Sequence, residues 1–288
     1  MYLTSLAVFV AVVEHGGFSA AAQQLHLTQP AVSKRIAQLE AELGMRLLDR
    51  LGRSVLPTEA GSLLLERART LLAAAADTRR AIAALNDGIG GTLRIATSHH
   101  IGLHYLPSLL RRYNQQFPQV ELDIAFVDSE QAYAQVLDGR VELAITTLAP
   151  VTPSPLQANR LWDDPLCFMA APDHPLSQRK RLGLKDLAAH PAVLPDAGTF
   201  THRLIAGLFA DNGLALQVRL HTNYLETIKM LVGVGLAWSA LPASLLDEQV
   251  IALPVTGPKL QRQLGWVRHG GRSLPRAAQA FVNLLAAG

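Results

Sequence analysis

Apolar positions change their spacing along the chain, from a helical period near the N-terminus to mixed strand and helix periods later. Leu6, Phe9, Val10 and Val13 fall on one face of a helix, so the apolar start of the chain predicts an amphipathic helix. The first basic side chain is Lys34, so this start lacks the basic segment of a signal peptide. No later run approaches the length of a membrane span.

The segment 18–43 predicts two short helices joined by a tight turn. Ser19 is a suitable N-cap for the first helix. Thr28 can cap the second helix, whose first turn accommodates Pro30 because the missing N–H of proline costs nothing there. Gly44 follows the last apolar position and predicts the end of that helix.

The second helix has one apolar face and one flat polar face. Val32, Ile36, Leu39 and Leu43 recur at helical spacing and predict a buried stripe. The opposite face carries small and polar side chains: Pro30, Ser33, Lys34, Ala37 and Gln38. Gln and Ser can bond base edges and Lys can meet phosphates, so this face, with Gln29 projecting beside it, suits the major groove of DNA. A plain surface helix of a helical bundle is the alternative.

The run FSAAAQQLHLTQPAVSKRIAQLEAELGMRLLDR, followed by GRSVLPTEAG, resembles the N-terminal domain of LysR-type transcriptional regulators. The length and layout of the rest agree with that family, although the family usually has Phe near Leu48 and a polar residue near Leu51. The resemblance implies a winged helix-turn-helix whose wing carries basic side chains near DNA. The alternative is that these side chains are ordinary solvated charges without a role in DNA binding. The predicted DNA contacts are Gln29, Pro30, Ser33, Lys34, Arg35, Arg50 and Arg53.

A long helix is predicted from a cap at Thr58 to about Asn86. Its apolar and small residues repeat in heptads, with Gly61, Ala68, Ala75 and Ile82 at one position and Leu64, Leu71, Thr78 and Leu85 at the other. This pattern predicts a partner helix, while packing against its own domain is the competing interpretation. LysR-type regulators dimerise through this helix, which implies a dimer or tetramer that presents paired recognition helices to a pseudo-palindromic operator.

Strands and helices alternate after the glycine-rich segment 87–91, which predicts α/β units built on mainly parallel strands. Two such units joined by two crossings resemble the periplasmic-binding-protein-like effector domain of the family. The expected fold class is therefore α+β multidomain. The expected domains are a winged helix-turn-helix (1–58), a linker helix (59–87) and an effector-binding domain (91–288), divided into subdomain I (91–162 plus 266–288) and subdomain II (163–265).

Polar side chains gather where the predicted strands end and helices begin. Ligands of such folds bind at the carboxyl ends of strands, and free N–H groups at helix starts suit an anion or carboxylate. The predicted effector contacts are Thr97, Ser98, His99, His100, Ser129, Thr146, Thr147, Thr199, Phe200, Thr201, His202, Asn223 and Trp238. Each has a purely structural alternative: the hydroxyl and amide side chains can be helix caps, and Trp238 can belong to the core.

Three histidines near the first of these strand ends invite a metal hypothesis. His100 and His104 lie about one helical turn apart, with His99 beside them. No carboxylate or cysteine is near in sequence, so we predict no metal and no cofactor; a titrating switch remains open, because histidine changes charge near neutrality.

Composition and missing motifs separate the remaining classes of protein. The 288 residues have a net charge of only +3, so a DNA-binding surface has to be local. The single cysteine, Cys167, excludes an internal disulfide and fits a reducing cytoplasm. An enzyme is disfavoured because the chain lacks a nucleophile elbow, a P-loop or a dinucleotide-binding loop. A solute-binding protein is also disfavoured, because such a protein has no use for the predicted N-terminal helices. We therefore expect a cytoplasmic regulator that binds operator DNA, a small effector and RNA polymerase.

Overall fold

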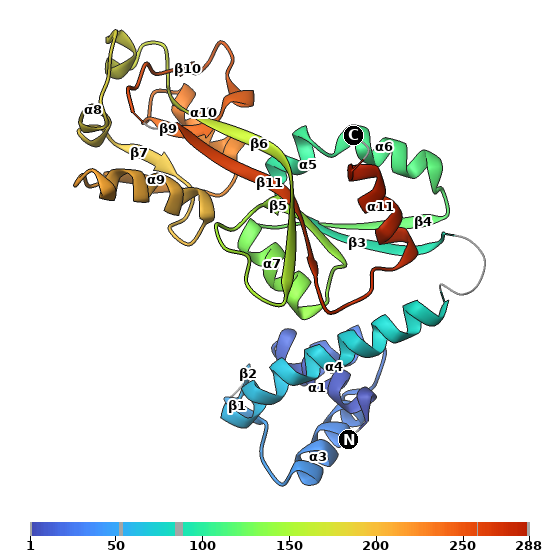
Figure 1. The fold of residues 1–288 in the computed structure, drawn as a ribbon. Helices are drawn as coiled ribbons and strands as arrows, with labels where there is room; N and C mark the ends of the chain where they lie inside the picture. Colours follow the sequence, from blue (N-terminus) through green and yellow to red (C-terminus); the bar gives the residue numbers. More distant parts are fainter. Residues whose placement is uncertain (1, 52–53, 84–88, 258, 287–288) are drawn as a thin grey trace. The chain divides into compact units, whose positions relative to one another are not determined.

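The computed structural model describes residues 2–51, 54–83, 89–257 and 259–286. The side chains of residues 50, 51, 54, 77 and 79–83 lie outside that description. The chain divides into two compact units, Met1–Asp87 and Gly88–Gly288 (Figure 1). Within the described ranges, no helix combines the length and the apolarity that crossing a membrane requires.

The first unit consists of three short helices, a two-stranded wing and a long helix. Its elements are α1 (Leu3–Glu14), α2 (Phe18–Gln24), α3 (Gln29–Leu43), β1 (Leu48–Leu51), β2 (Ser54–Pro57) and α4 (Glu59–Ala83). The buried side chains of Phe9, Val12, Ile36 and Leu47 join α1, α3 and the start of the wing in one core. The wing strands pair antiparallel. The predicted helix-turn-helix and wing are thus present.

The turn between α2 and α3 has a left-handed residue at its centre. His26 has φ +52°, and the N–H of Leu27 donates to the carbonyl of Ala22 at 2.9 Å. This is the hydrogen-bonding pattern that ends a helix through a left-handed residue. The predicted caps need correction: α2 begins at Phe18 after Gly17, and Thr28 precedes α3 without a capping side-chain bond.

The N-terminal half of α4 packs against its own unit. Thr58 Oγ1 accepts the N–H of Gly61 at 3.0 Å, which confirms the predicted cap. Ala68 is fully buried, and Arg69 pairs with Glu14 of α1 at 2.9 Å. A Cβ on Gly61 would lie 2.0 Å from the carbonyl oxygen of Leu47. Gly61 and Ala68, the first two residues of one heptad position, therefore serve packing within the unit, as the competing interpretation held.

The second unit contains two groups of strands and helices with separate cores. In chain order its elements are β3 (Gly91–Thr97), α5 (His99–His104), α6 (Pro107–Gln116), β4 (Val120–Phe126), α7 (Ser129–Asp138), β5 (Leu143–Thr147), β6 (Leu156–Ala170), η1 (Pro175–Gln178), α8 (Leu184–Ala188), β7 (Ala192–Leu194), α9 (Phe200–Asp211), β8 (Val218–His221), α10 (Leu225–Gly233), β9 (Ser239–Pro242), η2 (Ala243–Leu245), β10 (Ile251–Ala252), β11 (Leu260–His269) and α11 (Arg276–Ala286).

Subdomain I is organised around parallel strands with helices on both faces. β4, β3 and β5 are adjacent and parallel. Leu93 and Ile95 of β3 face α6 and α11, where they pack with Tyr113 and Phe281. Ala96 points the other way, toward α7. This alternation follows from the period of two along a strand.

Subdomain II contains β7 to β10 and α8 to α10. Its buried side chains form one cluster around Phe209 and Trp238, and another around Ile228 and Val232 of α10. β7 and β8 are parallel, whereas β9 and β10 run antiparallel to β6. The expectation of mainly parallel strands is therefore wrong for this half.

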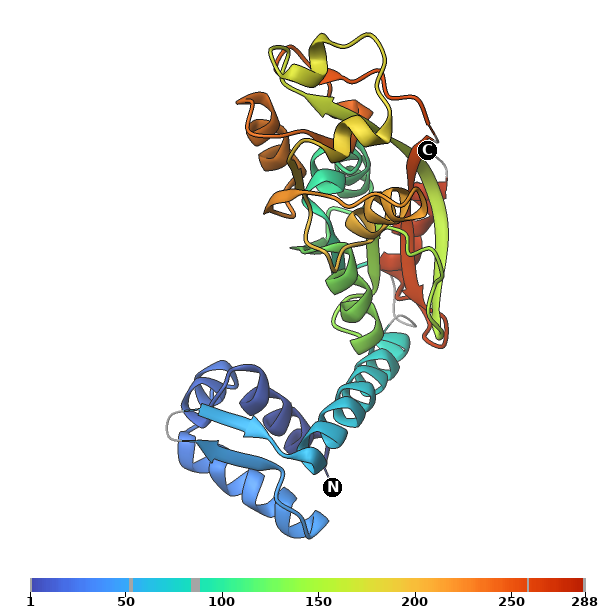
Figure 2. The same cartoon turned by 90° about the vertical axis from the view of Figure 1, so that its left-hand side faces the viewer.

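The two subdomains share the long strands β6 and β11. These strands pair antiparallel along their length (Figure 2). β11 also pairs with β5 of subdomain I, and β6 with β9 and β10 of subdomain II. Their register shifts once, between Leu264 and Gly265, close to the predicted crossing. A β-bulge of this kind bends a strand locally.

Two strands differ from their predicted limits. A strand was expected only from Leu166, but β6 begins at Leu156, and most side chains before Leu166 lie in solvent. Backbone pairing holds this edge segment, so it shows no apolar alternation. The strand expected at 236–239 is β9 at Ser239–Pro242, inside a continuous apolar run where periodicity sets no limit. Cys167 is half-buried, and burial raises the pKa of its thiol.

Substituting Gly61 by Ala tests the close contact between α4 and the first unit. The added Cβ meets a backbone oxygen that cannot move aside, so we expect a loss of about 1–3 kcal/mol in unfolding free energy. Gly207 of α9 is the control, because its Cβ would meet open space and Gly207→Ala should stabilise by about 0.5–1 kcal/mol. Urea unfolding followed by circular dichroism measures both; equal effects would contradict the contact.

Candidate functional site

The exposed face of α3 gathers the polar residues expected to read DNA. Val32, Ile36 and Leu39 are buried beneath it. Leu43, expected in the same stripe, is 41% exposed, so the stripe ends one turn earlier. At the start of the helix, Gln29 Nε2 donates to Ser33 Oγ at 3.2 Å. That bond links two side chains one turn apart, of which Gln29 is exposed and Ser33 half-buried.

A carboxylate ties the C-terminal part of α3 to the wing. Glu40 Oε1 accepts the backbone N–H of Leu47 at 2.8 Å and that of Leu48 at 3.3 Å. The helix and the first wing strand therefore share one hydrogen-bonded joint. Of the two arginines predicted on the wing, Arg53 and the side chain of Arg50 lie outside the described part of the chain.

A small cavity lies between the subdomains, where four helices begin. Its volume of about 50 Å³ exceeds the space that a single water molecule needs. Residues of α5, α7, α9 and α10, or residues directly before them, form its wall. Helix N-termini carry partial positive charge and N–H donors. The lining residues are Ser98, His99, His100, Asp128, Ser129, Glu130, Thr147, Pro195, Thr199, Phe200, Thr201, Asn223, Leu225 and Arg262.

Acidic side chains of subdomain I bond to groups of subdomain II across this cavity. Glu130 accepts the backbone N–H of Phe200, the first residue of α9. Asp128 Oδ2 accepts from Asn223 Nδ2 at 2.8 Å. Burial raises the pKa of the Glu130 carboxyl, so the protein bears a cost for keeping this charge at the helix start. The carboxylate of Glu130 therefore lies at the positively polarised start of α9.

An ion pair on the crossing strands forms the floor of the cleft. Arg262 of β11 and Asp164 of β6 face each other in the strand register, and both are buried. Arg262 Nε donates to Asp164 Oδ2 at 2.8 Å, and its Nη1 donates to Thr201 Oγ1 of α9 at 3.2 Å. Tyr105 Oη donates to the other carboxylate oxygen at 3.3 Å. These bonds satisfy the buried charges, as burial requires.

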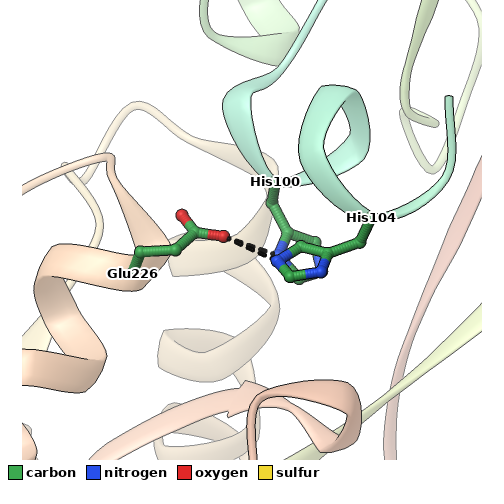
Figure 3. A group of neighbouring side chains, drawn as sticks. All are labelled: His100, His104 and Glu226. Atoms are coloured by element: carbon green, nitrogen blue, oxygen red, sulfur yellow. Dashed lines mark hydrogen bonds and ion pairs between the residues drawn. The ribbon is translucent and has the colours of Figure 1, made fainter. Parts of the chain in front are cut away.

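Two histidines of α5 and a glutamate of α10 meet beside the cavity (Figure 3). His100 Nδ1 and His104 Nε2 each lie 3.1 Å from Glu226 Oε1. A carboxylate accepts only, so both imidazole nitrogens donate to it. The hydrogen bond from His100 lowers the pKa of Glu226 to about 2. The cluster is a polar link between the subdomains.

Comparisons with known proteins agree with this architecture. The sequence matches the LysR substrate binding domain over residues 86–288 and the lysR-family bacterial regulatory helix-turn-helix protein over residues 3–62. The chain belongs to the LysR family. The HTH-type transcriptional regulator CbbR of Rhodospirillum rubrum is 33% identical over 291 residues, which cover 99% of this chain and 96% of CbbR. LysR-family proteins are DNA-binding transcriptional regulators with an effector-binding domain, so this chain is a regulator and not an enzyme.

Solved structures show the same fold. A full-length OxyR variant from Pseudomonas aeruginosa has a TM-score of 0.74 at 23% identity, covering 99% of this chain and 94% of that one. Full-length CbnR in complex with its target DNA has a TM-score of 0.67 at 24% identity, covering 100% of this chain and 99% of that one. At this identity the likeness concerns the fold alone.

Nine of the predicted effector contacts of this LysR-family chain line the cavity: Ser98, His99, His100, Ser129, Thr147, Thr199, Phe200, Thr201 and Asn223. Four others point elsewhere. Thr97 donates to the carbonyl of Ile145 inside the sheet, and Thr146 is fully buried. His202 bonds the carbonyl of Pro195 through Nδ1, and Trp238 lies in the core with Nε1 donating to two backbone carbonyls. The effector contacts themselves remain predictions.

Five lining residues were not among the predicted contacts: Asp128, Glu130, Pro195, Leu225 and Arg262. Asp128 and Glu130 flank the predicted Ser129 at the start of α7, so the position of that helix could have indicated them. Arg262 carried no comparable signal, because it lies within a strand and meets its partner only through pairing with β6.

Breaking the buried pair should destabilise the second unit strongly. Arg262→Met leaves the charge of Asp164 buried without its partner, with an expected loss of about 3 kcal/mol in unfolding free energy. Adding Asp164→Leu should restore most of that loss, because a well-packed apolar pair can replace a buried ion pair. Urea unfolding measures these variants.

The control is Arg160→Met, which breaks the half-exposed pair with Asp163 on β6 and should change stability by less than about 1 kcal/mol. An Arg262→Met variant as stable as Arg160→Met would show that the buried pair does not hold the strands.

Proposed function

We propose that this regulator reads operator DNA with the exposed face of α3 and changes its activity when a small polar effector enters the cavity between the subdomains. Four helices from both subdomains begin around one cavity, and this observation carries the proposal that an effector binds there. A ligand there touches both halves, so its binding energy can favour one arrangement of the subdomains over another.

The DNA-binding assignment rests on the chemistry and exposure of α3. The proposed contacts are Gln29, Pro30, Ser33, Lys34 and Arg35 on the helix, with Arg50 and Arg53 on the wing. The amide of Gln29 and the hydroxyl of Ser33 suit base edges, and the cations suit phosphates. CbnR, whose fold this chain shares, has been solved in complex with its target DNA, which supports the same role here.

Self-association through α4 is the second component of the proposal. Leu63 and Leu71 are 61% and 44% exposed, although the helix buries Ala68 against its own unit. Large exposed leucines on one helix favour a partner helix. We infer a dimer or tetramer that presents two or more recognition helices to a pseudo-palindromic operator in the cytoplasm, with RNA polymerase as a further partner.

An anion or a carboxylate is the proposed effector class. The helix starts supply donors, and the hydroxyls of Ser98, Thr147 and Thr201 stand around them. The carboxylate of Glu130 already bonds the start of α9. An anionic effector would take that place, release Glu130 and thereby remove a bond between the subdomains. This exchange gives the effector different affinities for the two arrangements.

Alanine substitutions on α3 separate base contacts from phosphate contacts. Gln29→Ala or Ser33→Ala should cost about 1–3 kcal/mol in operator binding and little on scrambled DNA, because only base contacts depend on sequence. Lys34→Ala should weaken both alike and lower the salt dependence by about one counterion. Fluorescence anisotropy over a salt series measures this. Equal losses on both duplexes for Gln29→Ala and Ser33→Ala would exclude them as base readers.

A thermal-shift screen of small anions and carboxylates tests the cavity. A specific hit should bind roughly tenfold tighter to Glu130→Gln, which removes the competing charge, and more weakly to Thr147→Val. Asp163→Asn, at an exposed acid outside the cavity lining, is the control and should change nothing. A ligand whose affinity changes in neither cavity variant would show that the effector binds elsewhere.

A further inference from the structure

The cluster of His100, His104 and Glu226 has the composition of a metal site, and its members come from both subdomains. The two histidines are four residues apart on α5, so they share one face of the helix. Glu226 lies in the first turn of α10, in subdomain II. Their side chains point toward one another (Figure 3). Sequence spacing showed only the two histidines, because the carboxylate is distant in the chain.

The distances fit a small divalent cation. The three ligand atoms, His100 Nδ1, His104 Nε2 and Glu226 Oε1, all lie within 4.8 Å of one another, and each histidine nitrogen is 3.1 Å from the glutamate oxygen. Zinc bonds nitrogen and oxygen at about 2.0–2.1 Å, so neighbouring ligand atoms of a tetrahedral site are about 3.3 Å apart. A zinc ion therefore requires only small movements of these side chains.

Access and charge also suit a cation. His100 is 3% exposed and forms an inner wall, whereas His104 and Glu226 are 38% and 35% exposed and leave an open side. The ionised carboxylate supplies negative charge, and imidazole with carboxylate is a ligand set for zinc and similar transition metals.

We propose that His100, His104 and Glu226 bind a divalent transition-metal ion of the zinc class and that this ion fastens α5 to α10 across the cleft. Three protein ligands leave the fourth tetrahedral position to water or to a ligand in the cavity, which His100 also lines. Binding replaces the two histidine protons that now face Glu226, so one proton is released or relocated for each imidazole. Metal would then favour the arrangement of the subdomains in which α5 and α10 lie next to each other, as an input separate from the anionic effector.

The surroundings of His100 indicate the strength of binding. When Nδ1 binds the metal, the ring proton resides on Nε2, which is buried and has no hydrogen-bond partner in the described part of the chain. Metal-bound imidazoles usually donate this proton to an acceptor, and losing such a partner weakens affinity about 10–100-fold. We therefore expect micromolar affinity rather than the much tighter binding of structural zinc sites.

The test uses the full chain, stripped with EDTA and dialysed, and titrates Zn²⁺ near neutral pH by calorimetry. The site variants are His104→Gln and Glu226→Gln, which change half-exposed side chains. The matched control is His190→Gln, because His190 belongs to another close imidazole pair, with His174. Unfolding of each metal-free variant verifies folding, and the visible spectrum of Co²⁺ reports tetrahedral coordination independently.

The proposal expects one Zn²⁺ per chain in the wild type and in His190→Gln, an upward shift of the unfolding temperature with metal, and a loss of at least about tenfold in affinity in both site variants. The Co²⁺ spectrum should change in the same two variants. Absence of binding in the wild type, or equal affinity in the wild type and the site variants, would overturn it. The anion screen uses metal-free protein, so either proposal can fail alone.

Discussion

Two antiparallel strands, β6 and β11, determine where the side chains of the cavity lie, because both subdomains are built on them. Their pairing is reinforced by the Arg262–Asp164 pair, which is buried and joins facing positions of the two strands. Near the bulge the strands come so close that a Cβ on Gly265 would lie 2.1 Å from the carbonyl oxygen of Asn159. Polar and steric constraints thus hold the floor of the cleft rigid.

The walls of the cleft are held differently from its floor. Glu130 and Asp128 reach from one subdomain to the other through hydrogen bonds to half-buried partners, and Glu226 does so through bonds to the buried His100 and the exposed His104. Such bonds contribute little net free energy when water or a ligand can replace them. A rigid floor with replaceable links above it lets the subdomains change their arrangement without loss of their separate cores. A ligand-responsive domain requires this combination.

Most of this architecture could be predicted from patterns within the chain. Helical and alternating periods located α3 and β4, because each buries one face against a core. The strands β3 and β5 are covered on both faces, and the alternation of strands with helices along the chain predicted them. Residues at strand ends, such as Ser98 and Thr147, were predicted near the cavity since fold topology brings these ends together.

These local patterns do not predict contacts between residues that are far apart in the chain. The partners of Arg262 and of His100 are 98 and 126 residues away in the chain, and no local period encodes such meetings. The mostly solvent-exposed first half of β6 had no apolar alternation, since it is held mainly by backbone pairing with β11. Trp238 shows the opposite case: it was predicted in the cavity from its place near a strand end, but it lies in the core, which its apolar neighbours had offered as the alternative.

The joint at Glu40 has a consequence for how the DNA-binding unit meets a duplex. Its carboxylate holds the backbone of both Leu47 and Leu48, so α3 and the first wing strand move as one body. If this helix and wing both contact DNA, as proposed, the joint opposes a change in the spacing between α3 and the start of the wing. The duplex has to deform instead, and stiff and pliable base steps differ in the energy of that deformation. Flexibility of the DNA would then contribute to the choice of site, even at base pairs that no side chain touches.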